Sequence, residues 1–246
     1  MRSLAKVLCT TFIASLALFG CGSGTGTDAH TPMHDHSPDM HAHGHGEPGH
    51  DPLVHRFQNA SDWAKDFDSP ERAAWQKPEE VVKLLQITPG MKVADIGAGT
   101  GYFEGPLSAA VGPNGQVLAL DIEQSMVDYI TARMDKEKIA NVKALQIPGD
   151  DPKLASSSVD RVLIVDTWHH IPGREAYAKK LAEGLAPGGF VMIVDFTMEA
   201  EHGPPKMHRI APEDVKKELE TAGLKGEIAQ ETLPEQYVVL GRKPAK

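Results

Sequence analysis

One short stretch constrains the fold more than any other part of this chain: "VADIGAGTGYF", residues 93–103. An apolar run ends in Asp95, and three glycines at alternate positions follow it. Glycine adopts the backbone conformations that a tight strand-to-helix turn requires, and such a turn points backbone N–H groups at a ligand. The stretch therefore predicts a ligand site at the end of a strand, built on Gly97, Gly99 and Gly101.

The pattern around this turn predicts the rest of the fold. From Met91 onward, apolar β-prone runs alternate with helical patterns, and no helical pattern separates the last two runs at Pro234. Strict alternation favours a parallel sheet with helices on both faces, whereas directly connected strands pair antiparallel. We expect a Rossmann-like α/β fold with a seven-stranded, mostly parallel sheet and one antiparallel strand.

Two details narrow the ligand of the glycine turn. The third glycine of a dinucleotide fingerprint is replaced by Tyr102, and no Gly-Lys-Ser/Thr follows the turn, which excludes a P-loop. Asp121 closes the next apolar run, "VLALD", 26 residues after Asp95. A carboxylate at the neighbouring strand end accepts both hydroxyls of a ribose, so the motifs indicate a nucleoside-containing ligand.

With these motifs the sequence resembles the class I S-adenosylmethionine-dependent methyltransferases, in a small-molecule branch similar to the ubiquinone/menaquinone-biosynthesis methyltransferases. The resemblance covers about residues 78–242 and rests on "VADIGAGTGYF", "VLALDIEQSM", "PGDD", "VDRVLIVDTWHHI" and "LAPGGFVMIVDF". The stretch "DDPKLASSSVDRV" departs from the family because it lacks the common leucine-proline pair. The loop against the adenine is therefore expected to differ.

The resemblance implies S-adenosylmethionine as cofactor and assigns residues to its parts. Asp121 takes the ribose hydroxyls, Ile122 lies against the adenine face, and Asp150, next to Asp151, accepts from the adenine amino group. The methionine end and the methyl group are lined by Asp95, Gly97, Gly99, Gly101 and Asp166.

Methyl transfer is an in-line displacement that needs a base only if the acceptor atom carries a proton. His169 and His170 follow a strand end directly and are the candidate bases, the alternative being a structural histidine bonded to backbone. Further on, "DFTMEAEHGPPKMHRIAPEDV" resembles a substrate-covering insertion. There Arg209 is a candidate for a substrate carboxylate or a surface ion pair, and His202 and His208 for a metal site.

The N-terminus predicts export. Residues 1–20 combine two early basic residues, a short apolar core and a small residue before Cys21, which resembles a bacterial lipoprotein signal. We expect Cys21 to carry a lipid that anchors the protein in the periplasm or at the outer membrane. The alternative is an uncleaved N-terminal anchor. The other cysteine, Cys9, lies inside the signal, so the mature chain has no internal disulfide.

Residues 21–55 read as a disordered tether, because they are rich in Gly, Pro, Asp and His and have no hydrophobic period. Eight of the chain's twelve histidines lie in it. Imidazole suits Zn, Cu and Ni, so this arm predicts a metal site, the alternative being a polar spacer. The candidate ligands are His34, His36, His41, His43 and His45.

Residues 56–90 predict short helices that form an N-terminal lid, and residues 91–246 the cofactor-binding domain. The formal charge of −9 and the absence of a basic cluster after the signal argue against nucleic acid. We expect a monomeric, lipid-anchored methyltransferase acting on a small molecule or an envelope component. The alternative is a periplasmic metal-binding lipoprotein whose nucleoside-ligand domain has no catalytic activity.

Overall fold

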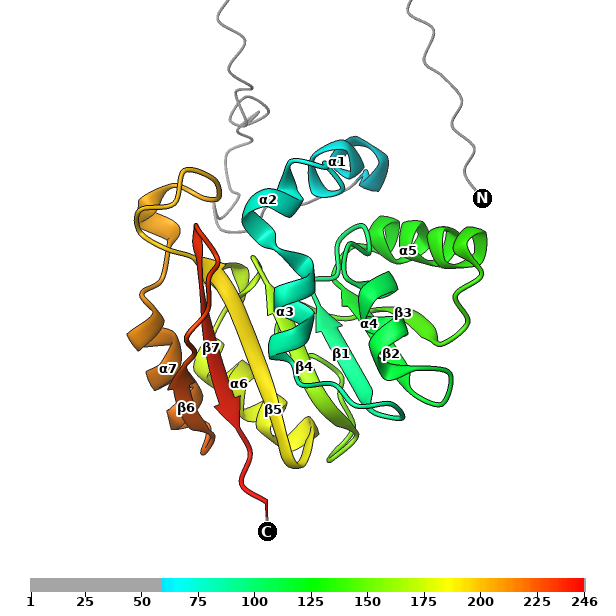
Figure 1. The fold of residues 1–246 in the computed structure, drawn as a ribbon. Coiled ribbons are helices and arrows are strands. Elements are labelled where there is room, and N and C mark those ends of the chain that lie inside the picture. Colours follow the sequence, from blue (N-terminus) through cyan, green and yellow to red (C-terminus); the bar gives the residue numbers. More distant parts are fainter. Residues whose placement is uncertain (1–58, 246) are drawn as a thin grey trace, which may run out of the picture. The chain divides into compact units, whose positions relative to one another are not determined.

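A seven-stranded sheet forms the centre of the molecule in the computed structural model, which describes residues 59–245 (Figure 1). Its strand order is β3-β2-β1-β4-β5-β7-β6, and only β7 runs antiparallel to its neighbours. This arrangement confirms the fold expected from the alternating pattern. The strands are β1 (Lys92–Ile96), β2 (Gln116–Asp121), β3 (Val142–Gln146), β4 (Val159–Val165), β5 (Leu185–Phe196), β6 (Lys225–Ile228) and β7 (Gln236–Arg242).

Helices form where the sequence supplies helix starts and an apolar stripe. Pro78 begins α3 and Pro212 begins α7, each with two acidic residues in the first turn, where they favour the positive end of the helix dipole. The helices are α1 (Ala60–Phe67), α2 (Arg72–Gln76), α3 (Pro78–Leu84), α4 (Glu104–Val111), α5 (Gln124–Glu137), α6 (Arg174–Gly184) and α7 (Pro212–Thr221), with 3-10 turns η1 (Trp168–His170) and η2 (Lys206–His208).

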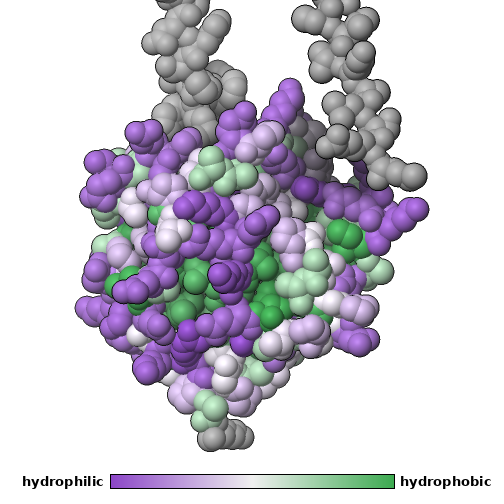
Figure 2. Space-filling view, viewed as in Figure 1, coloured by the Kyte–Doolittle hydropathy of each residue, from purple (hydrophilic) through white to green (hydrophobic). Residues whose placement is uncertain are grey.

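The core has a layer on each face of the sheet. On one face β5 and β7 contribute Met192, Val194 and Val238 to a cluster shared with α3 and α4. On the other face Val215 and Leu219 of α7 join a cluster with α6. Figure 2 shows an apolar area in the middle of the first face, over β5 and β7 beside α3, within a hydrophilic rim. Helices thus pack on both faces of the sheet.

The strand order places a site at one edge of the sheet. β1 pairs with β2 on one side and β4 on the other, so the chain leaves β1 and β4 in opposite directions at their carboxyl ends. A crevice forms at such a switch point in open α/β sheets. The helices α1 and α2 lie at this same edge, as Figure 1 shows, whereas residue 245 lies at the opposite one.

The expectations for residues 1–58 lie outside the described residues. They comprise the signal, the lipid on Cys21 and the histidine-rich arm. Within residues 59–245 no helix is both long and apolar enough to cross a membrane.

Candidate functional site

The glycine turn joins β1 to α4 and packs against the turn after β4. Gly97, Gly99 and Gly101 all have positive φ, at 75°, 58° and 82°. A Cβ on Gly97 would lie 2.2 Å from Oγ1 of Thr167, so only glycine fits between the two turns. Asp121 then fixes the turn from β2, because its Oδ2 accepts a 2.9 Å hydrogen bond from the Gly99 N–H.

Three buried carboxyl groups lie under and beside this turn. Asp95 is 3% exposed, Asp121 7% and Glu104 not exposed at all. Burial raises the pKa of Asp95 to about 7, and it raises the pKa values of Asp121 and Glu104 as well. Neither carboxyl oxygen of Glu104 has a hydrogen-bond partner in the described chain. Burial therefore disfavours the ionised form of these carboxyl groups, and a cationic ligand bound beside them would favour it.

Asp166, directly after β4, completes this acidic edge and is held by side chains from two other elements. Its Oδ1 accepts a 2.5 Å bond from Nε2 of Gln236 on β7, and its Oδ2 lies 3.7 Å from the guanidinium of Arg72 on α2. Gln76 bonds to both Gln236 and Arg72. Burial raises the pKa of Asp166 to about 7, with Arg72 acting in the opposite direction. Asp166 also has φ +52°, a left-handed conformation that is rare outside glycine.

The helices α1 and α2 cover the glycine turn, and we call them the cover helices. Phe67 lies 3.4 Å from the position of a Cβ on Gly99. Asp68 accepts bonds from Thr100 Oγ1 at 3.0 Å and from Arg133 of α5 at 2.9 Å. The guanidinium of Arg72 lies 4.3 Å from the centre of the Tyr102 ring. Helices in this segment were expected, and their role as a lid stays a prediction.

The two candidate bases have different surroundings. His169 is 7% exposed, and its Nδ1 lies 2.9 Å and 3.0 Å from the two carboxylate oxygens of Asp195, at the end of β5. The ring of His170 is less buried, and its centre lies 4.1 Å from that of His169. Asp195 is 2% exposed and also accepts from the Phe196 N–H. His169 is thus bound to a buried carboxylate.

At the other end of the site, the residues assigned to the adenine lie near each other. Ile122 is 42% exposed although it is apolar, and Gly149 packs beside it at 4.0 Å. The Asp150 side chain is exposed, whereas that of Asp151 pairs with Lys180 at 3.6 Å. Lysine contacts thus engage Asp151 and leave the Asp150 carboxylate facing solvent.

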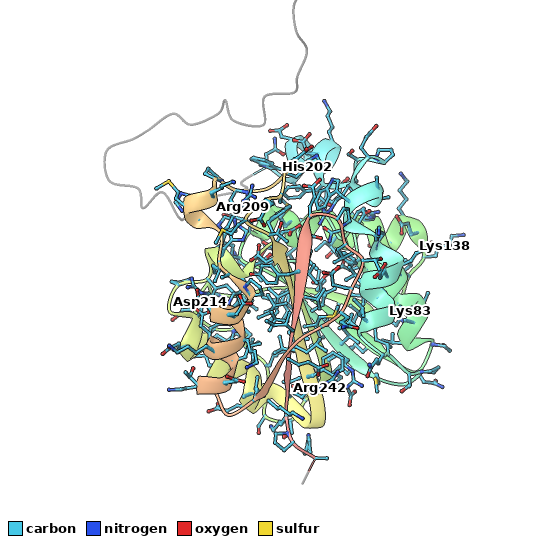
Figure 3. All side chains as sticks on the ribbon, turned by 60° about the vertical axis from the view of Figure 1, so that its left-hand side comes forward. Lys83, Lys138, His202, Arg209, Asp214 and Arg242 are labelled. Atoms are coloured by element: carbon cyan, nitrogen blue, oxygen red, sulfur yellow. The ribbon has the colours of Figure 1, made fainter. Side chains whose placement is uncertain are left out.

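The segment 197–211 has a different organisation from the one expected. Arg209 donates to four backbone carbonyls, those of Thr197, Ala200, His202 and Pro204, at 2.8–2.9 Å. Figure 3 shows it inside this segment, near His202. Among residues 59–245 Arg209 forms no ion pair with a surface acid, because its guanidinium bonds to its own loop, and its pairing with a substrate carboxylate stays a prediction.

His202 of the same segment forms no metal cluster. Its Nδ1 lies 2.9 Å from Glu235, and its ring stacks on Trp75 at 5.2 Å. Among residues 59–245 no group of three or more metal-binding side chains lies together. The candidate ligands His34, His36, His41, His43 and His45 are outside the described residues.

Several site residues were missed from the sequence. Arg72 and Gln76 come from the cover helices, and Gln236 from the antiparallel strand, so no motif around the glycine turn indicates them. The sequence does contain a signal for Asp195, because this residue lies at the end of an apolar run, as Asp95, Asp121 and Asp166 do. Glu104 had a weaker one, directly after "GYF".

Comparison with known proteins agrees with this geometry. Residues 93–189 match a family model described as a methyltransferase domain. A demethylmenaquinone methyltransferase of Staphylococcus aureus is 31% identical over 153 residues, which are 58% of this chain and 59% of that protein. The chain therefore matches less than two thirds of the length of these curated relatives.

Solved structures show the same fold. An S-adenosylmethionine-dependent methyltransferase from Aquifex aeolicus has a TM-score of 0.68 and 27% identity, covering 75% of this chain and 98% of that one. A possible exported protein from Bordetella parapertussis has a TM-score of 0.56 and 16% identity, covering 76% and 80%. The chain thus has the class I fold of the S-adenosylmethionine-dependent methyltransferases, and residues 93–189 are similar to the methyltransferase-domain family.

Proposed function

We propose that this protein transfers a methyl group from S-adenosylmethionine to a small molecule or an envelope component. The observation that carries the proposal is the glycine turn joined to Asp121 at the switch point of the sheet, within the matched domain. The Staphylococcus aureus relative is named for a quinone precursor, and an apolar ring is our first choice of acceptor.

The residues present fit the cofactor chemically. S-adenosylmethionine carries a sulfonium and an ammonium, and burial raises the pKa values of the Asp95 and Asp166 carboxyl groups to about 7. A cation bound beside them would favour their ionised forms. Ile122 offers an exposed apolar surface to a planar base. Arg72 of the cover helix α2 lies 3.7 Å from Asp166. Its guanidinium would pair with the carboxylate of the methionine moiety. When bound, the cofactor supplies the methyl group.

Ligand binding tests this proposal. At a hundredfold over Kd, S-adenosylhomocysteine stabilises the folded protein by about 2.7 kcal/mol, which raises Tm by roughly 5–10 °C. Asp121→Ala should abolish the shift, whereas Asp214→Asn on the exposed face of α7 should retain it. The absence of any shift in folded wild-type protein would contradict the proposal and favour the metal-binding alternative.

We further propose that the protein is exported and anchored through a lipid on Cys21. The signal-like segment 1–20 supports this, and the fold is compatible with it, since a possible exported protein shares it. Labelling cells with a radioactive fatty acid should mark the wild-type protein and not Cys21→Ser. Labelled Cys21→Ser, or protein recovered from the cytoplasm, would refute the anchor.

The histidine-rich arm supports a second activity, binding of Zn, Cu or Ni. Eight histidines within residues 30–55 bring several imidazoles within reach of one ion. Calorimetric titration should show tight binding to the full chain and none after deletion of residues 30–55. If methyl transfer survives that deletion, the arm is accessory; if binding survives it, the arm is not the metal site.

A further inference from the structure

The His169–Asp195 pair joins η1 to the end of β5 at the carboxyl edge of the sheet. The two side chains are 4% and 3% exposed and lie on different connections, η1 and the end of β5. Burying a charged carboxylate with a histidine is costly unless both are well bonded. Asp195 meets that requirement with bonds to Nδ1 of His169 and to the Phe196 N–H.

The geometry fixes which nitrogen of His169 carries the proton. Asp195 Oδ1 accepts from the Phe196 N–H at 2.9 Å, and both carboxylate oxygens face Nδ1. An ionised carboxylate only accepts hydrogen bonds, so Nδ1 is the protonated nitrogen and Nε2 carries the lone pair. Nε2 of His169 has no hydrogen-bond partner among residues 59–245. It is also absent from the fully buried polar atoms of this range that lack a partner, so it is not fully buried. It is therefore the nitrogen that can receive a proton.

Asp166, which the resemblance assigns to the methionine moiety and the methyl group, lies close enough to His169 for their charges to interact. It lies three residues before His169 on the turn that packs against Gly97. Four groups carry or can carry charge around the imidazole: Asp166 after β4, Asp195 on β5, His170 on η1, and Tyr237, the β7 residue paired with Asp195. Arg72 lies beyond Asp166. Asp195 bonds to the imidazole directly.

We propose that Asp195 is a positioning residue that orients His169 as a general base, and that the acceptor is therefore a weakly acidic hydroxyl, phenolic or enolic. This inference rests on the proposed methyltransferase function. His169 Nε2 takes the hydroxyl proton as the oxygen forms its bond to the methyl carbon. The carbon–sulfur bond breaks with its electron pair going to sulfur, and the proton on Nε2 later passes to water. An acceptor without a proton would make the pair unnecessary.

The isosteric variant Asp195→Asn tests the role of the carboxylate. The amide oxygen of the new asparagine still accepts the hydrogen bond from the Phe196 N–H, so its NH₂ group takes the place of Oδ2 and donates to Nδ1 of His169. The imidazole is then held with Nε2 protonated, where it is no base. We expect ¹⁵N-histidine NMR to show a bare Nε2 in wild type and a protonated Nε2 in Asp195→Asn. The signals that disappear in the spectrum of His169→Asn are those of His169. Asp214→Asn is the control and should give the wild-type spectrum.

Kinetics supply the second readout. With catechol as the hydroxyl probe, Asp195→Asn and His169→Asn should lose about 10²-fold or more of kcat while the affinity for S-adenosylhomocysteine is unchanged. His170→Asn should lose less than tenfold of kcat. Pyridine has no proton to lose, so any methylation of pyridine should proceed at the same rate in Asp195→Asn as in wild type. A wild-type Nε2 that is already protonated, a tautomer unaffected by Asp195→Asn, or methylation of pyridine but not catechol would overturn the inference. If the wild-type protein does not bind S-adenosylhomocysteine, the proposed function is wrong. The NMR spectra would still show which nitrogen of His169 carries the proton.

Discussion

Replacing Asp166 by Asn should stabilise the ligand-free protein above neutral pH and at the same time weaken cofactor binding. Burial raises the pKa of Asp166 from 3.8 to about 7. Between those values the native protein holds a proton that the unfolded chain has released, so the free energy of unfolding falls as pH rises. The fall is about 1.36 kcal/mol per pH unit, or about 2.7 kcal/mol from pH 5 to pH 7.

Two features of the structure adjust this figure. The Asp166 side chain is 19% exposed, and water screening reduces the expected effect to about 1–2 kcal/mol. Asparagine also tolerates the left-handed backbone at φ +52° and keeps an oxygen for Gln236. The variant should therefore lose pH dependence without losing the fold.

Urea unfolding of both proteins at pH 5, 6, 7 and 8 and constant ionic strength measures the difference. The two should be close at pH 5 and diverge by about 1–2 kcal/mol at pH 7, with Asp166→Asn the more stable. Affinity for S-adenosylmethionine should fall by about tenfold or more, because a charged partner is lost. Parallel stability curves with a constant offset across this pH range would refute the reasoning, and Asp214→Asn should show such parallel curves.

Three further outcomes are expected. Gly97→Ala should lower the free energy of unfolding in urea by more than about 2 kcal/mol, because its Cβ would lie 2.2 Å from Thr167. Gly105→Ala in α4 should instead raise the free energy of unfolding by about 0.5–1 kcal/mol, because no atom beyond its chain neighbours and its own helix backbone lies within 4 Å of its Cβ. Equal effects of the two substitutions would contradict the packing argument. Glu104→Gln should flatten the decline of Tm as pH rises above 5, since burial raises the pKa of Glu104 and the substitution removes its ionisation; an unchanged slope would refute this. Arg209→Ala should make trypsin cleave after Lys206 about tenfold faster by removing four bonds to the loop carbonyls, and unchanged cleavage would show that other contacts hold it.

The fold could be predicted because it follows from local patterns that repeat along the chain. Each buried parallel strand is a continuous apolar run, and each ends near a glycine or an acid, as at Asp95 and Asp121. The missing helix at Pro234 was enough to predict the antiparallel strand. These signals are properties of neighbouring residues, and the sequence displays them directly.

The candidate site was only partly predictable, because its polar contacts join residues far apart in sequence. Gln236 bonds to Asp166 over 70 positions and to Gln76 over 160. No periodicity or motif records such pairs. Arg209 shows that local contacts can be missed too: a substrate carboxylate and a surface acid were considered as its partners, and its bonds in the structure go to carbonyls only five to twelve positions away.

The position of the cover helices determines where the domain is attached to the chain that precedes it. α1 begins at Ala60 and lies at the carboxyl edge of the sheet, whereas β7 ends at the opposite edge (Figure 1). In the lipid-anchored protein proposed above, a pull from the membrane through the N-terminal link would therefore act first on the cover helices, which pack on the glycine turn. Mechanical load on that link would be borne first by Asp68–Arg133 and Arg72–Asp166, so attachment and access to the cofactor become mechanically coupled.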